Sequence, residues 1–252
     1  MAEKSQKGEQ GKVWVVIPAA GIGKRMQSET PKQYIKINGK TILEHTLDCF
    51  IEHPEIAGCV VALASEDPYW KSLSVHASAR DFPLYSVEGG DERSDSVSQA
   101  LDYLNVVGQL KEESWVMVHD AARPCLSQQD ITRLLSLKSE DGNGGILASP
   151  VRDTMKRAKS GQTIISHTES RDDLWHALTP QLFKLGELTT ALEYCFENGI
   201  DVTDEASAME AKNYQVSLVE GDSSNIKVTR PADIELATWL LSRKGEAHEY
   251  EA

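Results

Sequence analysis

Several residue types are scarce in this chain of 252 residues, and each scarcity excludes a class of protein. The four cysteines are widely separated and form no Cys-x-x-Cys pair, which argues against a zinc site or a disulfide framework. With 26 basic against 39 acidic residues, the net charge of −13 argues against a surface for nucleic acid. No apolar run approaches the length of a membrane span, so we expect no membrane partner.

The first 12 residues are polar and contain no hydrophobic segment of the kind found in signal peptides. We therefore expect a cytoplasmic protein, with residues 1–12 and 246–252 as flexible tails. The chain is long enough to bury a full core, as one large α/β domain or two small ones. Because it contains no internal repeat and no low-complexity linker, we predict one domain over residues 13–245.

Short apolar runs alternate with amphipathic segments of helical length. The predicted strands cover residues 13–17, 58–64, 84–87, 115–119, 145–149 and 215–219. The predicted helices cover residues 42–53, 94–107, 127–138, 185–198 and 231–243. This alternation indicates an α/β fold with a mainly parallel sheet and helices on both faces. Because ligands bind beyond the carboxyl ends of such strands, the loops after Ile17, Val87 and His119 should lie together at one edge.

One segment, residues 152–171, breaks the alternation. Two β-like runs flank a polar turn that contains Gly161, which predicts a β-hairpin. A lone hairpin is only marginally stable in water. This hairpin should therefore pack either on its own domain or on a partner chain, and we favour the partner.

The loop after the first predicted strand contains small residues and glycines, followed by cations. Gly21 and Gly23 leave room for close approach to the backbone, whose amides could then converge on an anion. The alternative is a turn in which glycine serves geometry alone. A dinucleotide fingerprint requires a third glycine where Met26 stands, and a Walker loop requires Ser or Thr where Arg25 stands. We infer a nucleoside triphosphate loop of another kind, in which Arg25 and Lys32 take up charge on phosphoryl groups.

Asp120 and Arg123 follow the predicted strand at 115–119. A carboxylate at this position could hold Mg²⁺, which would also contact substrate phosphates, and Arg123 could bind a second phosphorylated molecule. The alternative is an Asp–Arg ion pair that shapes the turn. We interpret His119 as a packed histidine at the end of the strand rather than a catalytic base.

Three further segments support binding of a phosphorylated ligand, each with a structural alternative. Residues 89–96 could bind a base and ribose, or Ser94 or Asp91 could simply cap a helix. Lys227 could direct a cation at a phosphate, or could be an exposed strand lysine. Thr203 is predicted first as a helix cap. Together the segments favour phosphoryl or nucleotidyl transfer, which requires mainly positioning and charge neutralisation.

The motifs resemble one family, the 2-C-methyl-D-erythritol 4-phosphate cytidylyltransferases. The segments that carry the resemblance, in order from Val13 to about Leu241, are 18–26 with 31–34, 89–93, 118–124, 151–154 and 225–231. The resemblance implies a Rossmann-like fold, similar to the nucleotide-diphospho-sugar transferases, with an inserted β-hairpin arm. It also implies an enzyme that joins CTP and 2-C-methyl-D-erythritol 4-phosphate, with Mg²⁺, in the non-mevalonate isoprenoid pathway. The products would be 4-diphosphocytidyl-2-C-methyl-D-erythritol and pyrophosphate.

The resemblance also implies roles for individual residues. The implied CTP-binding residues are Pro18, Ala19, Ala20, Gly21, Gly23, Gly90, Asp91, Ser96 and Ala121. The implied catalytic residues are Arg25, Lys32 and Lys227. The implied residues for the polyol phosphate are Asp120, Arg123, Thr154, Arg171 and Thr203, with Asp120 beside the metal as well. In this family the residue matching Arg171 comes from the partner's arm, which implies a homodimer through arm exchange at about residues 152–172.

One position departs from the family's pattern. The residue before Asn225 is often acidic in the family and is Ser224 in this chain, so Asp222 or Asp120 alone would have to hold the metal. Three rival functions stay open at this point. They are a ribitol 5-phosphate cytidylyltransferase, a catalytically silent nucleotide-binding dimer, and a NAD-dependent oxidoreductase, which the missing third glycine disfavours.

Overall fold

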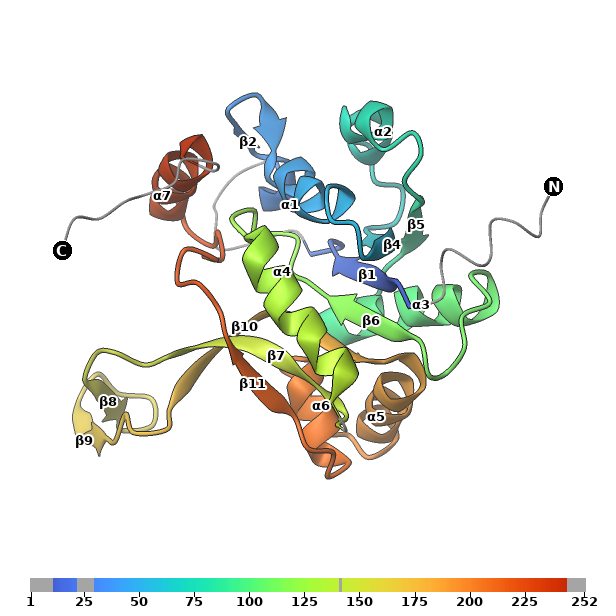
Figure 1. The fold of residues 1–252 in the computed structure, drawn as a ribbon. Helices are drawn as coiled ribbons and strands as arrows, with labels where there is room; N and C mark the ends of the chain where they lie inside the picture. The colour runs from blue at the N-terminus through green and yellow to red at the C-terminus, as the bar shows by residue number, and fades with distance from the viewer. Residues whose placement is uncertain (1–10, 22–29, 141, 244–252) are drawn as a thin grey trace.

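The computed structural model describes residues 11–21, 30–140 and 142–243, and its centre is a seven-stranded sheet (Figure 1). The strand order is β11 (Ser217–Glu220), β7 (Gly144–Pro150), β10 (Trp175–Lys184), β6 (Trp115–Val118), β1 (Val13–Pro18), β4 (Ile56–Leu63) and β5 (Leu84–Glu88). Strands β6, β1, β4 and β5 run parallel, whereas β10 is antiparallel to both β6 and β7. The predicted α/β fold with a mainly parallel sheet is confirmed.

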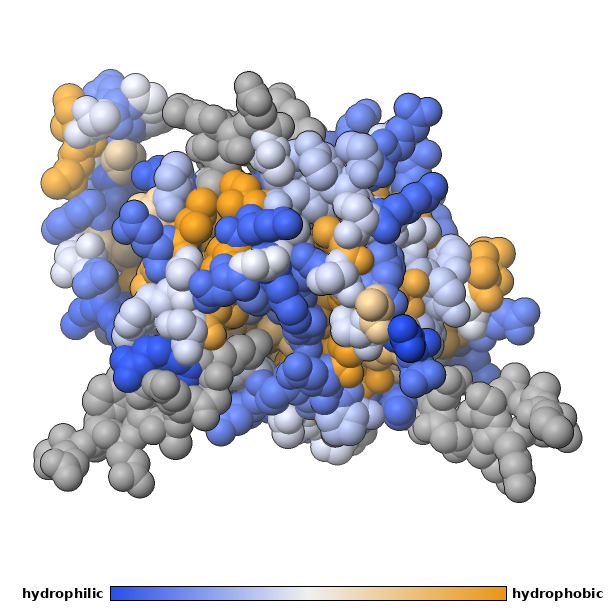
Figure 2. Space-filling view, turned by 90° about the horizontal axis from the view of Figure 1, so that it is seen from above, coloured by the Kyte–Doolittle hydropathy of each residue, from blue (hydrophilic) through white to orange (hydrophobic). Residues whose placement is uncertain are grey.

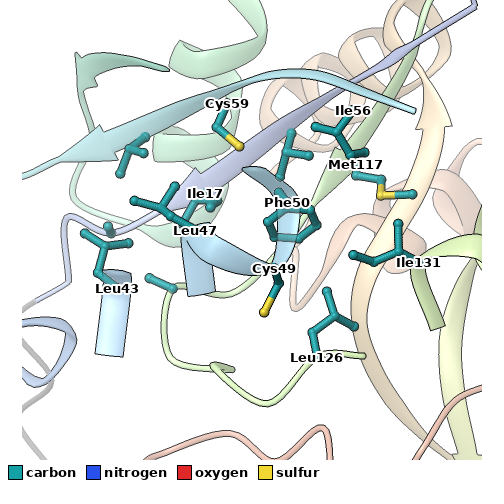
Figure 3. Packing of buried hydrophobic residues seen from close by; sticks show 14 of the residues in the cluster. Ile17, Leu43, Leu47, Cys49, Phe50, Ile56, Cys59, Met117, Leu126 and Ile131 are labelled. Atoms are coloured by element: carbon teal, nitrogen blue, oxygen red, sulfur yellow. The ribbon is translucent and has the colours of Figure 1, made fainter. Parts of the chain in front are cut away.

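Helices cover both faces of the sheet, so consecutive residues of a strand are buried in two different cores. Val15 and Ile17 of β1 belong to a core with α1 (Ile42–Ile51) and α4 (Gln128–Leu135). Val16 belongs to a second core, formed with α3 (Arg93–Val106), α5 (Leu185–Glu197) and α6 (Glu205–Ala211). Figure 3 shows the first core, where Phe50 of α1 lies among Ile17, Leu47 and Met117. Burial on both faces explains why these strands are almost wholly apolar.

The remaining elements lie around this sheet. The two-residue strands β2 (Lys36–Ile37) and β3 (Lys40–Thr41) pair with each other, and α2 (Val75–Ser78) follows β4. Helix α7 (Pro231–Ser242) packs through Ala237 on a small third core that includes Ile37 and Val228. Seen from above, the surface is mainly hydrophilic, with separate apolar patches between charged side chains (Figure 2). No helix in the described parts of the chain is long and apolar enough to cross a membrane.

The predicted hairpin is present as β8 (Met155–Ala158) and β9 (Ile165–Glu169). The two strands are antiparallel, with Met155 opposite Glu169, and they form a sheet of their own. Figure 1 shows this hairpin projecting from the body of the molecule. Ile164 and Ile165 are more than half exposed, at 56% and 59%. The hairpin therefore has little apolar contact with its own domain.

Several sequence predictions differ from the structure. Strand β10 was not predicted, although it lies near the middle of the sheet between β6 and β7. Its sequence gives no continuous strand pattern, because Pro180 interrupts it and only its second half is buried. The short elements β2, β3 and α2 and the 3₁₀ turns 32–34 and 70–72 were also not predicted, and the last residues of the helix predicted at 127–138 belong to a 3₁₀ turn, 136–139. The predicted tails lie outside the described residues, apart from residues 11 and 12.

Candidate active site at the carboxyl edge of the sheet

A cavity lies where three loops meet at the carboxyl ends of β1, β5 and β6. Its lining residues are Pro18, Ala19, Ala20, Gly21, Lys32, Gln33, Gly90, Asp91, Glu92, Arg93, Ser96, Asp120, Ala121, Ala122 and Lys227. The expected meeting of these loops at one edge is confirmed. Eleven of the seventeen sequence-predicted site residues line this cavity; they are Pro18, Ala19, Ala20, Gly21, Lys32, Gly90, Asp91, Ser96, Asp120, Ala121 and Lys227. Gly23 and Arg25 lie outside the described residues.

Ala19, the first residue after β1, is held by two hydrogen bonds. The Ala19 N–H donates to the Ala62 carbonyl at 2.7 Å, and the Gln33 side-chain amide donates to the Ala19 carbonyl at 2.7 Å. Gln33 belongs to the 3₁₀ turn 32–34, so the same contact carries Lys32 to the cavity. These bonds tie the end of β1 to β4 and to the turn that carries Lys32.

The loop after β5 packs closely against the loop after β1, and its glycines allow this. A Cβ on Gly89 would lie 2.8 Å from the Ala20 Cβ, and a Cβ on Gly90 would lie 2.3 Å from the Asp95 Cβ. The buried Ser96 hydroxyl accepts from the Gly90 N–H at 3.2 Å. The predicted caps of α3 were wrong, because Glu92 is the N-cap residue and its N–H donates to Asp95.

Asp120 is buried at the bottom of the cavity among three cations. Its Oδ2 lies 2.7 Å from the Lys227 Nζ and 3.6 Å from the Arg123 Nε, and its Oδ1 accepts from the Arg93 Nε at 3.1 Å. Burial alone would raise the pKa of the Asp120 carboxyl, but Arg93, Lys227 and Arg123 hold it well below its usual range. Asp120 is therefore an anion at neutral pH.

Lys227 reaches Asp120 because the segment before α7 runs beside the loop after β6. The Val228 N–H donates to the Ala122 carbonyl at 2.8 Å, and the Arg123 Nη1 donates to the Asn225 carbonyl at 2.7 Å. Arg123 is buried and does not line the cavity. Its contacts agree with the turn-shaping alternative rather than with direct binding of a ligand.

Arg93 is a site residue that the sequence reasoning missed. It is the first residue of α3, it lines the cavity, and its two Nη atoms donate to the carboxylate of Glu205 at 2.6 and 3.0 Å. Burial would lower the pKa of Arg93, but Glu205 and Asp120 raise it. Two signals in the sequence pointed to it: its place directly after the loop that follows β5, and its membership of segment 89–93, which carries the family resemblance.

His119 lies behind Asp120 and is fully buried. Its Nε2 lies 3.1 Å from the Arg123 carbonyl, which can only accept, so Nε2 carries the proton and Nδ1 accepts from the Thr179 hydroxyl at 3.0 Å. Burial lowers the pKa of His119 to about 4. The interpretation of His119 as a packed histidine is confirmed. Thr179, which is joined to Pro180 by a cis peptide bond, also accepts from the Asp120 N–H at 3.1 Å.

Three predicted substrate residues lie away from the cavity lining. Thr154 and Arg171 belong to the ends of the arm, where the Arg171 guanidinium donates to the Arg152 carbonyl. Thr203 precedes α6, but it is not the cap, because the N-cap residue is Asp204 and its side chain accepts from the Ser207 N–H at 3.0 Å. In the described chain, none of these three residues lines the cavity that contains Asp120.

Three carboxylates line this cavity, those of Asp91, Glu92 and Asp120, and Asp120 follows the end of β6. No group of three or more His, Cys, Asp or Glu side chains is placed for a metal within residues 11–21, 30–140 and 142–243. Asp222 lines a different hollow, and its side chain accepts from the Ser224 N–H at 2.7 Å. One hard carboxylate fits Mg²⁺, which commonly takes one or two carboxylates and completes its shell with water and substrate phosphates.

The chain is similar to proteins of one family over nearly all of its length. The sequence model of the 2-C-methyl-D-erythritol 4-phosphate cytidylyltransferases matches residues 13–243. A protein of that name from Alteromonas mediterranea is 52% identical over 237 residues, which are 94% of this chain and 95% of the relative. One from Vibrio vulnificus is 51% identical over 229 residues, which are 91% of this chain and 94% of the relative.

Solved structures agree with this similarity. The crystal structure of 2-C-methyl-D-erythritol 4-phosphate cytidylyltransferase from Francisella tularensis has a TM-score of 0.77 at 40% identity, covering 91% of this chain and 99% of that one. The protein of the same name from Thermus thermophilus has a TM-score of 0.74 at 30% identity, covering 92% of this chain and 99% of that one.

Proposed function

The chain belongs to the 2-C-methyl-D-erythritol 4-phosphate cytidylyltransferase family, and we propose how its own residues carry out the reaction. The enzyme joins CTP and 2-C-methyl-D-erythritol 4-phosphate to give 4-diphosphocytidyl-2-C-methyl-D-erythritol and pyrophosphate, a step of non-mevalonate isoprenoid synthesis. The observation that carries the proposal is the cavity in which Lys32, Asp120 and Lys227 meet the glycine-containing loops.

The nucleotide occupies the part of the cavity formed by the loops after β1 and β5. Gly21 and Gly90 present backbone without side chains, which leaves room for close approach of a ligand. Ser96 holds the loop at Gly90 in shape through its hydroxyl. The residues proposed for CTP are Pro18, Ala19, Ala20, Gly21, Gly23, Gly90, Asp91, Ser96 and Ala121.

The chemical step is an in-line displacement at the α-phosphorus of CTP. A phosphate oxygen of methylerythritol phosphate forms the new P–O bond, and the bond from the α-phosphorus to the bridging oxygen of pyrophosphate breaks. Lys32 and Lys227 stabilise the charge that develops on the transferring and leaving groups, and Arg25 completes the proposed catalytic set.

No general base is required for this step. The attacking phosphate has a second pKa of about 6 and is already an anion near neutral pH. This agrees with His119, whose ring nitrogens are both engaged in buried hydrogen bonds and whose pKa is lowered to about 4. The positively charged side chains therefore act by position and charge rather than by moving protons.

Asp120 would hold the divalent metal ion, Mg²⁺. When bound there, Mg²⁺ supplies positive charge to the phosphate oxygens as a Lewis acid. Asp120 also holds Lys227 at 2.7 Å, so one carboxylate positions both the lysine and the site for the cation.

The polyol phosphate would be bound by residues of two chains. Arg171 and Thr154 lie on an arm that projects from its own domain and exposes Ile164 and Ile165. Exchange of arms in a homodimer would bury these isoleucines and bring Arg171 to the cavity of the partner. Thr203 and Arg123 complete the proposed set, with Arg123 acting through its contacts to Asp120 and Asn225. The proposed domain spans residues 13–245, with the arm at 152–172.

Pyrophosphate release tests this proposal. The purified enzyme is given CTP, UTP or ATP with methylerythritol phosphate or ribitol 5-phosphate at equal concentrations. Turnover should be fastest for CTP with methylerythritol phosphate. Preferential consumption of ribitol 5-phosphate would contradict the proposed substrate, and absence of pyrophosphate with every pair would indicate a silent nucleotide-binding protein.

A further inference from the structure

Glu205, the first residue of α6, is a fully buried carboxylate that the mechanism above does not use. Its side chain is 0% exposed, and both of its oxygens accept from Arg93. The third donor of the same guanidinium, Nε, bonds to Asp120 Oδ1. We propose that Glu205 and Arg93 are positioning residues that hold Asp120 in the orientation in which it meets Lys227. This inference rests on the proposed function.

The geometry limits the ways in which Asp120 can move. Arg93 binds Oδ1 at 3.1 Å, and Thr179 accepts from the Asp120 N–H at 3.1 Å, so both ends of the residue are fixed. Oδ2 is then directed at Lys227, 2.7 Å away. A rotation of the carboxylate would break the bond to Arg93. The Asp120–Lys227 contact is therefore set by a chain of hydrogen bonds that begins at α6.

The charge balance separates this role from simple neutralisation of Asp120. Lys227 and Arg123 already lie 2.7 and 3.6 Å from Asp120 Oδ2, so its charge is compensated without Arg93. Arg93 instead fixes the orientation of the Asp120 carboxylate. Its planar guanidinium donates in fixed directions to the carboxylates of Asp120 and Glu205 at the same time. A lysine in its place would keep the charge but could not reproduce this fork.

A contribution to folding stability is a weak explanation for the buried ion pair of Arg93 and Glu205. The cost of removing two charges from water often exceeds their attraction, and replacing a buried pair by apolar side chains is commonly neutral or stabilising. The Arg93 side chain is 27% exposed and forms part of the cavity wall, whereas Glu205 is sealed behind it. The pair thus connects the Asp120 carboxylate in the cavity to the interior of the protein.

The test compares two variants with the wild type in the pyrophosphate-release assay. Arg93→Lys keeps the charge and loses the fork, and Arg93→Met with Glu205→Leu removes the pair together so that no buried charge is left unpaired. We expect kcat to fall by about 10- to 100-fold in both, as for other side chains that orient a metal-ligating carboxylate. The KM for CTP should stay within about threefold, because the bonds to Asp120 rather than to the nucleotide are lost.

Arg133→Lys is the matched control. Arg133 pairs with Asp130, whose side chain is also 0% exposed, but neither residue lines the cavity. Its kcat should equal that of the wild type, and thermal unfolding should show that the variants fold. Wild-type kcat in Arg93→Lys or in the folded double variant would overturn the positioning role. If the double variant does not fold, Arg93→Lys alone decides the outcome. Absence of turnover in the wild type would instead refute the proposed function.

Discussion

Replacing Lys227 by alanine separates a role in the transition state from a role in binding. The Lys227 Nζ lies 2.7 Å from Asp120, and its side chain is 36% exposed. Asp120 keeps Arg93 and Arg123 as partners in the variant, so its buried charge stays paired and the variant should fold. Removing one cationic donor from developing charge typically costs about 3 kcal/mol, which is roughly 100-fold in kcat.

The assay is steady-state pyrophosphate release at saturating methylerythritol phosphate with CTP varied. Lys227→Ala should lower kcat roughly 100-fold and change the KM for CTP much less. Lys111→Ala is the control, because Lys111 is exposed and precedes the amino end of β6, the end opposite the cavity. A rise in KM with unchanged kcat, or an equal loss in kcat and in CTP affinity, would refute the transition-state role.

Three further predictions concern folding, assembly and the metal. Burial would raise the pKa of Glu44, which is 4% exposed, but hydrogen bonds from Ser74 and Thr41 lower it from 4.5 to about 2. This carboxylate therefore stabilises the fold above pH 4.5 by about 3 kcal/mol, and the contribution is lost as the pH falls toward 2. The destabilisation of Glu44→Gln, measured by urea unfolding, should be roughly 2 kcal/mol smaller at pH 3 than at pH 7. Mixing inactive Arg171→Ala and Lys32→Ala chains under conditions of subunit exchange should restore part of the turnover, because some sites would receive both intact residues. EDTA should abolish turnover, and excess Mg²⁺ should restore it.

Each of these three predictions can be contradicted by a specific result. The same loss of stability for Glu44→Gln at both pH values would mean that the carboxylate is not held ionised by its neighbours. Activity of the mixture equal to the sum of the separate variants would argue against arm exchange. Full turnover in EDTA would exclude the proposed metal at Asp120.

The parallel part of the fold could be predicted from local pattern, whereas strand β10 could not. Strands β1, β4 and β6 are short apolar runs followed by turn residues and helices, a pattern visible within a few residues. Strand β10 is defined by antiparallel pairing with β6 and β7, which are distant in the sequence. Pro180 interrupts it, and the residues before Pro180 are mostly exposed or half-buried, so the strand gives no local indication of that pairing.

The candidate site likewise contains residues that could be predicted from the sequence and residues that could not. Asp120 and Lys227 could be predicted because the strand-end rule and the motifs point to them, and the structure places them 2.7 Å apart. The pair of Arg93 and Glu205 joins residues 112 positions apart, so no local spacing reveals it. Arg171 was assigned through the resemblance, and a single chain does not carry it to the cavity.

Transfer of a cytidylyl group from CTP to a polyol phosphate in this cavity can be followed by ³¹P NMR of the reaction itself. With CTP, methylerythritol phosphate and Mg²⁺, we expect the monoester signal of the polyol phosphate to be replaced by the two signals of a diphosphate diester. One pyrophosphate should form for each CTP consumed. Release of CDP with a phosphorylated polyol, or of CMP with an unchanged polyol phosphate, would contradict attack at the α-phosphorus by the polyol phosphate.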